Sequence, residues 1–528
     1  MKRYIRIIAS MLLGGAILGA CNGTDYDFSV CEMKVDRDAI VDVAAQNPGL
    51  EAVVLTTTAP YWMVQTPDWI TPDATTGYGE QSIITFTIAS NFRNENTDMA
   101  ARSGEIKISG GMTSVIIIVN QLGYTAPVDP DASIGGITDI DEFKDFVAAV
   151  NNGRKLSRWY NSDGEVELLT DIDLSDFTEW EPIGMPEKVT YGNNSLTYTG
   201  SSFKGKFNGG GHTISNFNLT TAVGKDAAVG FFGMLDGATV KDLTINGKMS
   251  ISATGAGSAG MLAGAMISTT VENVKVNADV EFKGTITSDR FATGGVVGFT
   301  YGTGDANSLI KDCVMTGNVN VVSGDGNTAN GATAAVYGGI TGFSTTPAES
   351  ANVIANCENN GKITASLGRC SGIVATAHAG TTISGCVNNA DQVNTFGDGR
   401  IGNIVSVIGT KGCIEDCINN GNLTTTTAKT TTGAIAALLN ESHVVIKGGR
   451  NNGTIIGGNT STIGLIAANF SKFSSVSGFT VSGKIGYYKE DGNHEMQDLN
   501  EGTYMKFIGK ITSANLAKVT DIKFEPAK

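Results

Sequence analysis

Hydrophobic and polar residues alternate along much of the chain, as they do in β-strands with one buried face. Segments 82–88 and 104–109 both show this period of two. The run 114–119 is almost continuously β-branched, which predicts a strand buried on both faces. Turn-forming residues separate the segments between 27 and 124. Strands of this spacing favour a small β-sandwich over residues 27–124.

One segment of the chain after residue 21 has helical periodicity. Phe143, Phe146 and Val150 recur at helical spacing, with Asp139 as a candidate N-cap and Gly153 as a stop signal. The sequence therefore predicts a helix that opens a second domain at residue 139.

A short element of the form apolar-x-x-apolar recurs from residue 240 onward, in most copies followed by Gly four positions later. Successive copies follow one another at nearly equal intervals, except for two longer steps. Those steps predict extra loops near 285–292, 323–334 and 345–350. The second apolar position is filled by Leu243, Val274, Cys313, Cys357, Cys386, Cys417, Gly449 and Phe479.

A second element, usually Gly, two mostly apolar residues and a small residue, alternates with the first. Its copies begin at Gly230, Gly260, Gly295, Gly339, Gly372, Asn403, Gly433 and Gly464. Such a regular period, roughly 30 residues long and built from short strands, is typical of a solenoid. We predict an all-β chain in which the sandwich is followed by a right-handed parallel β-helix.

The predicted β-helix has about three strands per rung and covers residues 139–486, including the helix as its N-terminal cap. Residues 125–138 contain Pro127 and Pro130 and read as a linker. Residues 487–528 leave the repeat, and we expect them to form a C-terminal cap.

The composition of the chain bears mainly on which partners the protein could bind. The chain has 528 residues, 68 of them Gly, and its 37 basic and 52 acidic side chains give a net charge of −15. Such an acidic chain lacks the basic surface that nucleic acid requires, so we expect no nucleic-acid partner. Hydrophobic residues make up 41% of the chain, enough for a sizeable core.

The amino terminus has the features of a secretory signal peptide. Lys2, Arg3 and Arg6 precede an apolar run over 7–18, which is too short to span a membrane. The sequence Leu-Gly-Ala-Cys at 18–21 resembles the lipobox of bacterial lipoproteins. The resemblance implies a signal peptide over 1–20, acylation of Cys21 and a tether over 21–26. An ordinary signal peptide is the alternative.

Asp25 and Asp27 follow the lipobox and are similar to the acidic export signal of Bacteroidetes surface lipoproteins. This implies a lipid-anchored protein in the cell outer membrane, exposed on its surface.

The first domain carries a second resemblance. Trp62, the segment 67–69 with Trp69, the segment 102–106 and the closing segment 119–123 resemble a BACON domain. That family is an immunoglobulin-like sandwich of Bacteroidetes surface proteins, and the resemblance implies a carbohydrate-binding module or a spacer. Trp62 and Trp69 could stack on sugars or belong to the core.

The second repeated element resembles the GLUG motif of bacterial surface proteins. Segments 169–174, 180–184 and 203–214 resemble the entry of those β-helices. β-Helices also host polysaccharide lyases and glycosidases, which need paired carboxylates. The entry segment contains a group of acids, but acidic rungs like those of pectin-degrading enzymes are absent from the sequence. These acids are Asp171, Asp173, Asp176, Glu179 and Glu181.

We accordingly predict no catalytic residues, no cofactor and no metal site. His494 and Glu495 lack the second His of a zinc protease motif, and the chain has no Cys-x-x-Cys spacing. Cysteines in the first element, Cys313, Cys357, Cys386 and Cys417, are predicted to form an inward column of small hydrophobic side chains. Disulfides or a metal are the alternatives.

Paired asparagines occur at 359–360, 388–389, 419–420 and 451–452. They predict an amide ladder along the stack, with one Asn of each pair in the left-handed conformation. The alternative is a polar strip that meets glycan hydroxyls.

The sequence as a whole favours a non-catalytic glycan-binding or adhesion scaffold. A polysaccharide lyase or glycoside hydrolase of the β-helix type is the alternative. The expected partners are the outer membrane, through the lipid anchor, and glycans or other host or bacterial surface polymers. Which residues bind carbohydrate is not predictable from the sequence.

Overall fold

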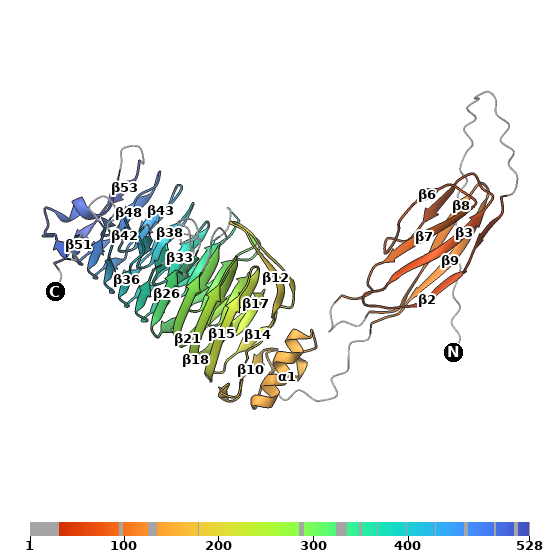
Figure 1. The fold of residues 1–528 in the computed structure, drawn as a ribbon, viewed down its shortest axis with the longest axis horizontal. Helices are drawn as coiled ribbons and strands as arrows, with labels where there is room; N and C mark the ends of the chain where they lie inside the picture. Colours follow the sequence, from red (N-terminus) through yellow and green to blue (C-terminus); the bar gives the residue numbers. More distant parts are fainter. Residues whose placement is uncertain are drawn as a thin grey trace, which may run out of the picture. The chain divides into compact units, whose positions relative to one another are not determined.

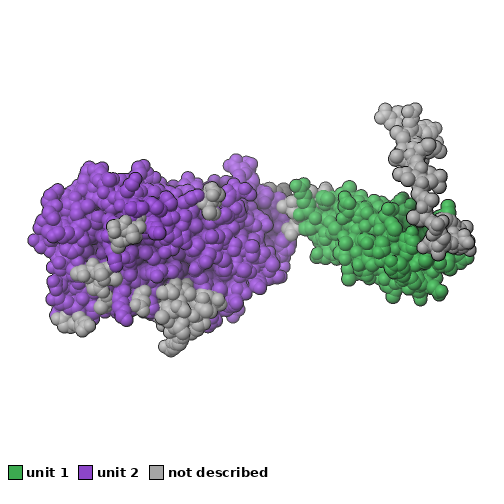
Figure 2. Space-filling view, turned by 90° about the horizontal axis from the view of Figure 1, so that it is seen from above, with its two compact units in different colours: residues 1–127 green, residues 128–528 purple. Residues whose placement is uncertain are grey.

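The chain divides into two compact units, residues 1–127 and 128–528, which are coloured separately in Figure 2. The computed structural model describes residues 31–93, 99–124, 135–177, 179–284, 290–323, 335–347, 351–366, 368–397, 399–427, 429–458, 463–489, 493–511 and 516–526. The predicted signal peptide, Cys21, the tether and most of the predicted linker lie outside these residues.

The first unit is a sandwich of two sheets. One sheet has the strand order β1-β3-β7-β5 and the other β2-β9-β8-β4-β6. The strands are β1 (Met33–Val35), β2 (Ala39–Val43), β3 (Leu50–Thr57), β4 (Trp62–Gln65), β5 (Ile70–Pro72), β6 (Thr76–Gly77), β7 (Gln81–Ile88), β8 (Arg102–Gly110) and β9 (Thr113–Gln121).

Alternate side chains of the two sheets meet in one core. Ile84 and Phe86 of β7 are fully buried against Ile106 of β8 and Ile117 of β9. The prediction that 114–119 is buried on both faces is wrong, because Ile116 is 46% exposed. Within the described residues no further layer covers the outer face of β9, so its β-branched residues alternate between core and surface.

The second unit is a parallel β-helix (Figure 1). A representative rung contains β34 (Thr381–Ser384), β35 (Val387–Asn388), β36 (Gln392–Asn394), β37 (Arg400–Gly402) and β38 (Val405–Ile408). The first three strands belong to a sheet of 27 strands, and β37 and β38 belong to two separate sheets of eight strands. All five pair in parallel with the equivalent strands of the next rung.

Strand pairing confirms the register predicted from the first repeated element. Val240 pairs with Val271, Val271 with Ile310, and Ile310 with Ile354. The long intervals are therefore absorbed within single rungs. Residues 285–289, 324–334 and 348–350 of the predicted extra loops lie outside the described residues. In the early rungs the three short strands merge into β18 (Thr239–Ala253) and β21 (Thr270–Gly284).

In eight rungs a left-handed residue directly precedes the second apolar position of the first element. Its φ is between 51° and 54° where the residue is Asp or Asn and between 61° and 66° where it is Gly. The prediction that one Asn of each pair takes this conformation is wrong. The left-handed residues are Asp242, Asn273, Asp312, Asn356, Gly385, Asp416, Gly448 and Gly478.

Helix α1 (Ile140–Asn151) covers the first rungs, as predicted. Asp139 caps it by accepting hydrogen bonds from the backbone N–H groups of Asp141 and Glu142. The buried face of the helix presents Phe143 and Phe146 to aromatic rings of the entry segment and first rungs. Figure 1 shows the helix at the start of the stack.

The C-terminal segment partly rejoins the stack. Strand β52 (His494–Met496) runs antiparallel to β51 (Ile485–Tyr488). Strands β53 (Lys518–Thr520) and β54 (Lys523–Phe524) pair in parallel with β49 (Ser475–Ser477) and β50 (Thr480–Val481). Within the described ranges, no helix is both long and apolar enough to cross a membrane.

Candidate functional site

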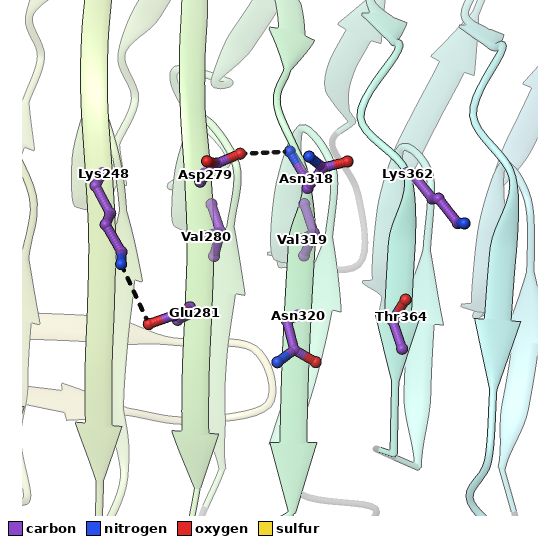
Figure 3. A pocket seen from close by; sticks show the side chains of 9 residues that line it. All are labelled: Lys248, Asp279, Val280, Glu281, Asn318, Val319, Asn320, Lys362 and Thr364. Atoms are coloured by element: carbon purple, nitrogen blue, oxygen red, sulfur yellow. Dashed lines mark hydrogen bonds and ion pairs between the residues drawn. The ribbon is translucent and has the colours of Figure 1, made fainter.

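A polar groove of about 470 Å³ lies on the outer face of the long sheet (Figure 3). It crosses four successive rungs, on β18, β21, β26 (Val319–Ser323) and β31 (Ile363–Ala365). Buried Val280 and Val319 form its floor. The strand period of two turns their neighbours outward, so the rim is polar. The rim consists of Lys248, Asp279, Glu281, Asn318, Asn320, Lys362 and Thr364.

Basic, acidic and neutral polar side chains follow one another along the groove. Lys248 Nζ lies 3.5 Å from Glu281 Oε2, and Asp279 Oδ1 accepts a 2.8 Å hydrogen bond from the backbone N–H of Asn318. Figure 3 shows both contacts. The Lys362 side chain is exposed and has no hydrogen-bond or ion-pair partner among the described residues. The groove thus offers ammonium, amide and hydroxyl groups at the rung spacing of about 4.8 Å.

The acids of the entry segment do not form a carboxylate pair poised for acid catalysis. Asp171 accepts a hydrogen bond from the backbone N–H of Thr213 and lies 3.1 Å from His212 Nδ1. Asp173 accepts from the side-chain amide of Asn216 and the backbone N–H of Ser175. These hydrogen bonds lower the pKa of both carboxyls, whereas a general acid needs a raised pKa.

The other acids of the entry segment are exposed: Asp176, Glu179 and Glu181. Glu181 borders a recess of about 240 Å³ beside Asn151 and Pro186. His494 and Glu495 lie on exposed β52. In the described residues no group of three or more His, Cys, Asp or Glu side chains could hold a metal ion.

The predicted cysteine column is confirmed as part of the β-helix core. Cys313, Cys357, Cys386 and Cys417 are at most 1% exposed, and all four are free thiols. Each column Sγ lies within hydrogen-bond reach of the backbone carbonyl two residues earlier. Burial raises the pKa of the Cys357 thiol well above its usual range, so the thiolate is disfavoured.

The paired asparagines form two amide ladders. In the inner ladder the side chains of Asn359, Asn388, Asn419 and Asn451 are fully buried, and adjacent amides are joined by hydrogen bonds of 2.8–3.1 Å. In the outer ladder Asn360, Asn389, Asn420 and Asn452 are joined by hydrogen bonds of 2.7–2.9 Å. The inner ladder is structural, and only the outer one can meet a ligand.

The two tryptophans of the first unit are not open platforms for sugar. Trp62 is 4% exposed, and its Nε1 donates to Ser82 Oγ at 3.2 Å. Trp69 packs against the sandwich core, and the Arg102 guanidinium lies 4.3 Å above its ring. That cation covers the ring face that a sugar would use.

Comparisons with known proteins match part of this architecture. Residues 61–122 match the BACON family, described as "Putative binding domain, N-terminal". This supports the predicted resemblance for the first unit. No curated protein matches the chain.

Two similar solved structures come from Bacteroides ovatus. A protein titled "putative immunoglobulin A1 protease" shares 15% identity, covering 74% of this chain and 84% of its own, with a TM-score of 0.36. A GH5 xyloglucanase in complex with a XXXG heptasaccharide shares 14% identity, covering 35% of this chain and 36% of its own, with a TM-score of 0.16.

Proposed function

We propose that the protein is a surface-exposed lipoprotein that binds glycans without cleaving them. Cys21 would carry the lipid, and the outer face of the β-helix would carry the binding surface. The groove of Figure 3 is the observation that carries this proposal. It presents hydrogen-bonding side chains from four rungs in a recess large enough for part of an oligosaccharide.

The chemistry of the groove suits hydroxyl-rich ligands. Asn320, Thr364 and Lys362 are exposed and lie on neighbouring strands, where they can donate and accept hydrogen bonds. The match of residues 61–122 to a family described as a binding domain supports the same class of function. Affinity would come from several modest contacts rather than from one residue.

A glycan array probed with the purified protein tests the proposal. We expect binding to at least one glycan class, and we expect Lys362→Ala combined with Asn320→Ala to weaken it about tenfold, equivalent to about 1.4 kcal/mol. The matched control is Lys484→Ala, which removes an exposed lysine at the position equivalent to Lys362 in a later rung, away from the groove. An equal loss in this control and in the double variant, or no binding to any glycan, would contradict the proposal.

A further inference from the structure

A second hydrophobic cluster lies outside the main core of the β-helix. It brings together Ala292 and Val336 from one eight-stranded sheet with Phe299 and Phe343 from the other. The hairpin of β12 (Pro186–Tyr191) and β13 (Leu196–Gly200) packs on this cluster through Val189 and Leu196. The outer sides of the two sheets therefore face one another, and the hairpin fills the space between them.

The tip of the hairpin ends beside a small pocket. The hydroxyl of Thr345 donates to the backbone carbonyl of Asn193 at 2.7 Å, and His378 Nδ1 lies 3.0 Å from Asn194 Oδ1. Beyond the tip is a pocket of about 160 Å³. Its lining includes Asn193, Arg290, Arg369, Thr376, His378 and Arg400.

Three arginines from three rungs converge on this pocket. Arg369 and Arg400 are register partners at the starts of β32 (Arg369–Ser371) and β37, and Arg290 directly precedes β22 (Phe291–Gly294). Their grouping matters because the chain carries a net charge of −15. Arginines that are removed from solvent are normally paired with carboxylates.

These arginines have no carboxylate partner in the described part of the chain. Arg290 donates to Asn193 Oδ1 at 3.1 Å and stacks 4.2 Å from the Phe343 ring. Arg369 donates to Thr376 Oγ1 at 3.3 Å, and its buried Nε has no partner. Arg400 forms no ion pair with a described residue. The nearby Glu441 instead accepts hydrogen bonds from the backbone N–H and the hydroxyl of Thr410.

Partial burial of these charges is unfavourable, because no described carboxylate pairs with them. Burial lowers the pKa of Arg290 to about 10, and burial together with the Arg400 and Arg290 charges lowers the pKa of Arg369 to about 10. Both groups nevertheless stay cationic at neutral pH. Burial also lowers the pKa of His378, which keeps its ring neutral there. The pocket therefore holds concentrated positive charge without a counter-ion from the described residues.

We propose that the arginine pocket binds an oxyanion, and that its ligand is the carboxylate or sulfate group of an acidic sugar. Guanidinium groups match both oxyanions because their N–H donors form a planar fork. The volume equals that of roughly five water molecules at about 30 Å³ each, enough for one oxyanion and an adjoining ring edge. The identity of the ligand as a sugar rests on the proposed function, whereas the oxyanion site does not.

Inorganic sulfate tests the oxyanion site directly. We expect isothermal titration of sulfate to give saturable binding in the wild type and at least a tenfold weaker constant in Arg369→Met and in Arg400→Met. The matched control is Arg154→Met, which removes one exposed charge outside the pocket. Melting curves in sulfate give a second readout, because its general stabilising effect is shared by all variants and cancels in the comparison.

Weaker sulfate binding by the Arg369→Met variant could not be explained by a loss of folding. Arg369→Met removes a partly buried charge that has no described carboxylate partner, so without ligand the variant should melt no lower than the wild type. Identical sulfate titrations for wild type and Arg369→Met would overturn the oxyanion site.

Acidic and neutral oligosaccharides of equal length separate the two proposals. Binding of uronate- or sulfate-bearing sugars that is lost in Arg369→Met but kept in Lys362→Ala supports the acidic sugar as ligand. Sulfate binding without binding of any sugar would leave the oxyanion site in place and overturn its assignment to a glycan. Glycan binding that is unchanged in Arg369→Met would place the glycan site elsewhere and overturn the same assignment.

Discussion

Asn388 and Asn389 are adjacent in the chain, and their side-chain amides donate in opposite directions along the stack. Asn388 Nδ2 donates to Asn419 Oδ1 in the next rung at 3.1 Å, whereas Asn389 Nδ2 donates to Asn360 Oδ1 in the preceding rung at 2.9 Å. The inner and outer ladders thus have opposite polarity, so their amide dipoles oppose one another. The strand period of two, which turns one Asn inward and the next outward, puts the two ladders side by side.

Because the inner ladder is buried, we expect its disruption to destabilise the protein more than disruption of the outer ladder. Asn388→Ala leaves the Asn359 amide and the Asn419 carbonyl oxygen without their ladder partner, so we expect destabilisation of about 2–4 kcal/mol. Asn389→Ala exposes its partners to water, and we expect a loss of less than about 1 kcal/mol. Urea unfolding of both variants measures the difference. Equal destabilisation of the two variants would show that burial does not determine how much each ladder stabilises the protein.

Cys386 tests the thiol column. Cys386→Ser buries a hydroxyl in an apolar column, and we expect it to lower the free energy of unfolding by about 1–3 kcal/mol. Cys386→Ala should be milder. Intact-mass measurement after alkylation should find Cys313, Cys357, Cys386 and Cys417 reduced once the protein is unfolded. A mass that reveals a disulfide among them would refute the column.

Cys21 tests the anchor, which lies outside the described residues. The wild-type protein should partition into detergent and incorporate labelled palmitate, because the sequence at 18–21 resembles a lipobox. Cys21→Ala should lose both properties. Continued labelling of the variant would exclude acylation at this position.

The entry-segment acids test the alternative that the protein is an enzyme. We expect Asp171→Asn, Asp173→Asn and Glu179→Gln to leave glycan binding within about twofold, because catalysis depends on one or two acids and distributed binding does not. The wild type should release no reducing ends or unsaturated products from polysaccharides. Turnover that disappears in any one of these variants would establish the enzyme.

The N-terminal cap should respond to acid. Glu142 accepts hydrogen bonds from Arg158 and from the Trp159 indole N–H, and these contacts lower its pKa below the ordinary value of 4.5. A lowered folded-state pKa adds stability above the unfolded-state pKa, and this stability is lost as pH falls through the folded-state value. Melting temperatures below about pH 4.5 should therefore fall more steeply for the wild type than for Glu142→Gln. Parallel curves would contradict this coupling.

The stacking of rungs in the β-helix could be predicted, because one repeated sequence pattern marks the residues that pair between rungs. Val240, Val271 and Ile310 occupy one frame of the sequence, and strand pairing brings those same residues together. The left-handed turn is harder to locate, because the Asn pairs are the more visible repeat. The turn actually falls on a position where Asp, Asn and Gly interchange, as at Asp312 and Gly385.

The arginine pocket could not be predicted in the same way. Arg290 lies outside the frame shared by Arg369 and Arg400, so no repeat links all three. The hairpin brings Asn193 to Arg290 across a sequence separation of 97 residues, and it belongs to no repeat. Only the fold places these residues together.

Because every strand of the rung at β34–β38 meets an equivalent strand one repeat later, the β-helix is modular. Removing residues 387–417 would join Cys386 to Ile418. Asn419 would then take the place of Asn388 and accept the hydrogen bond from the Asn359 amide, so both neighbouring rungs would find equivalent partners. The rod would shorten by about 4.8 Å with its caps unchanged. The same deletion would remove Arg400. The length of the β-helix can therefore vary by whole rungs, whereas the arginine pocket needs the rung that carries Arg400.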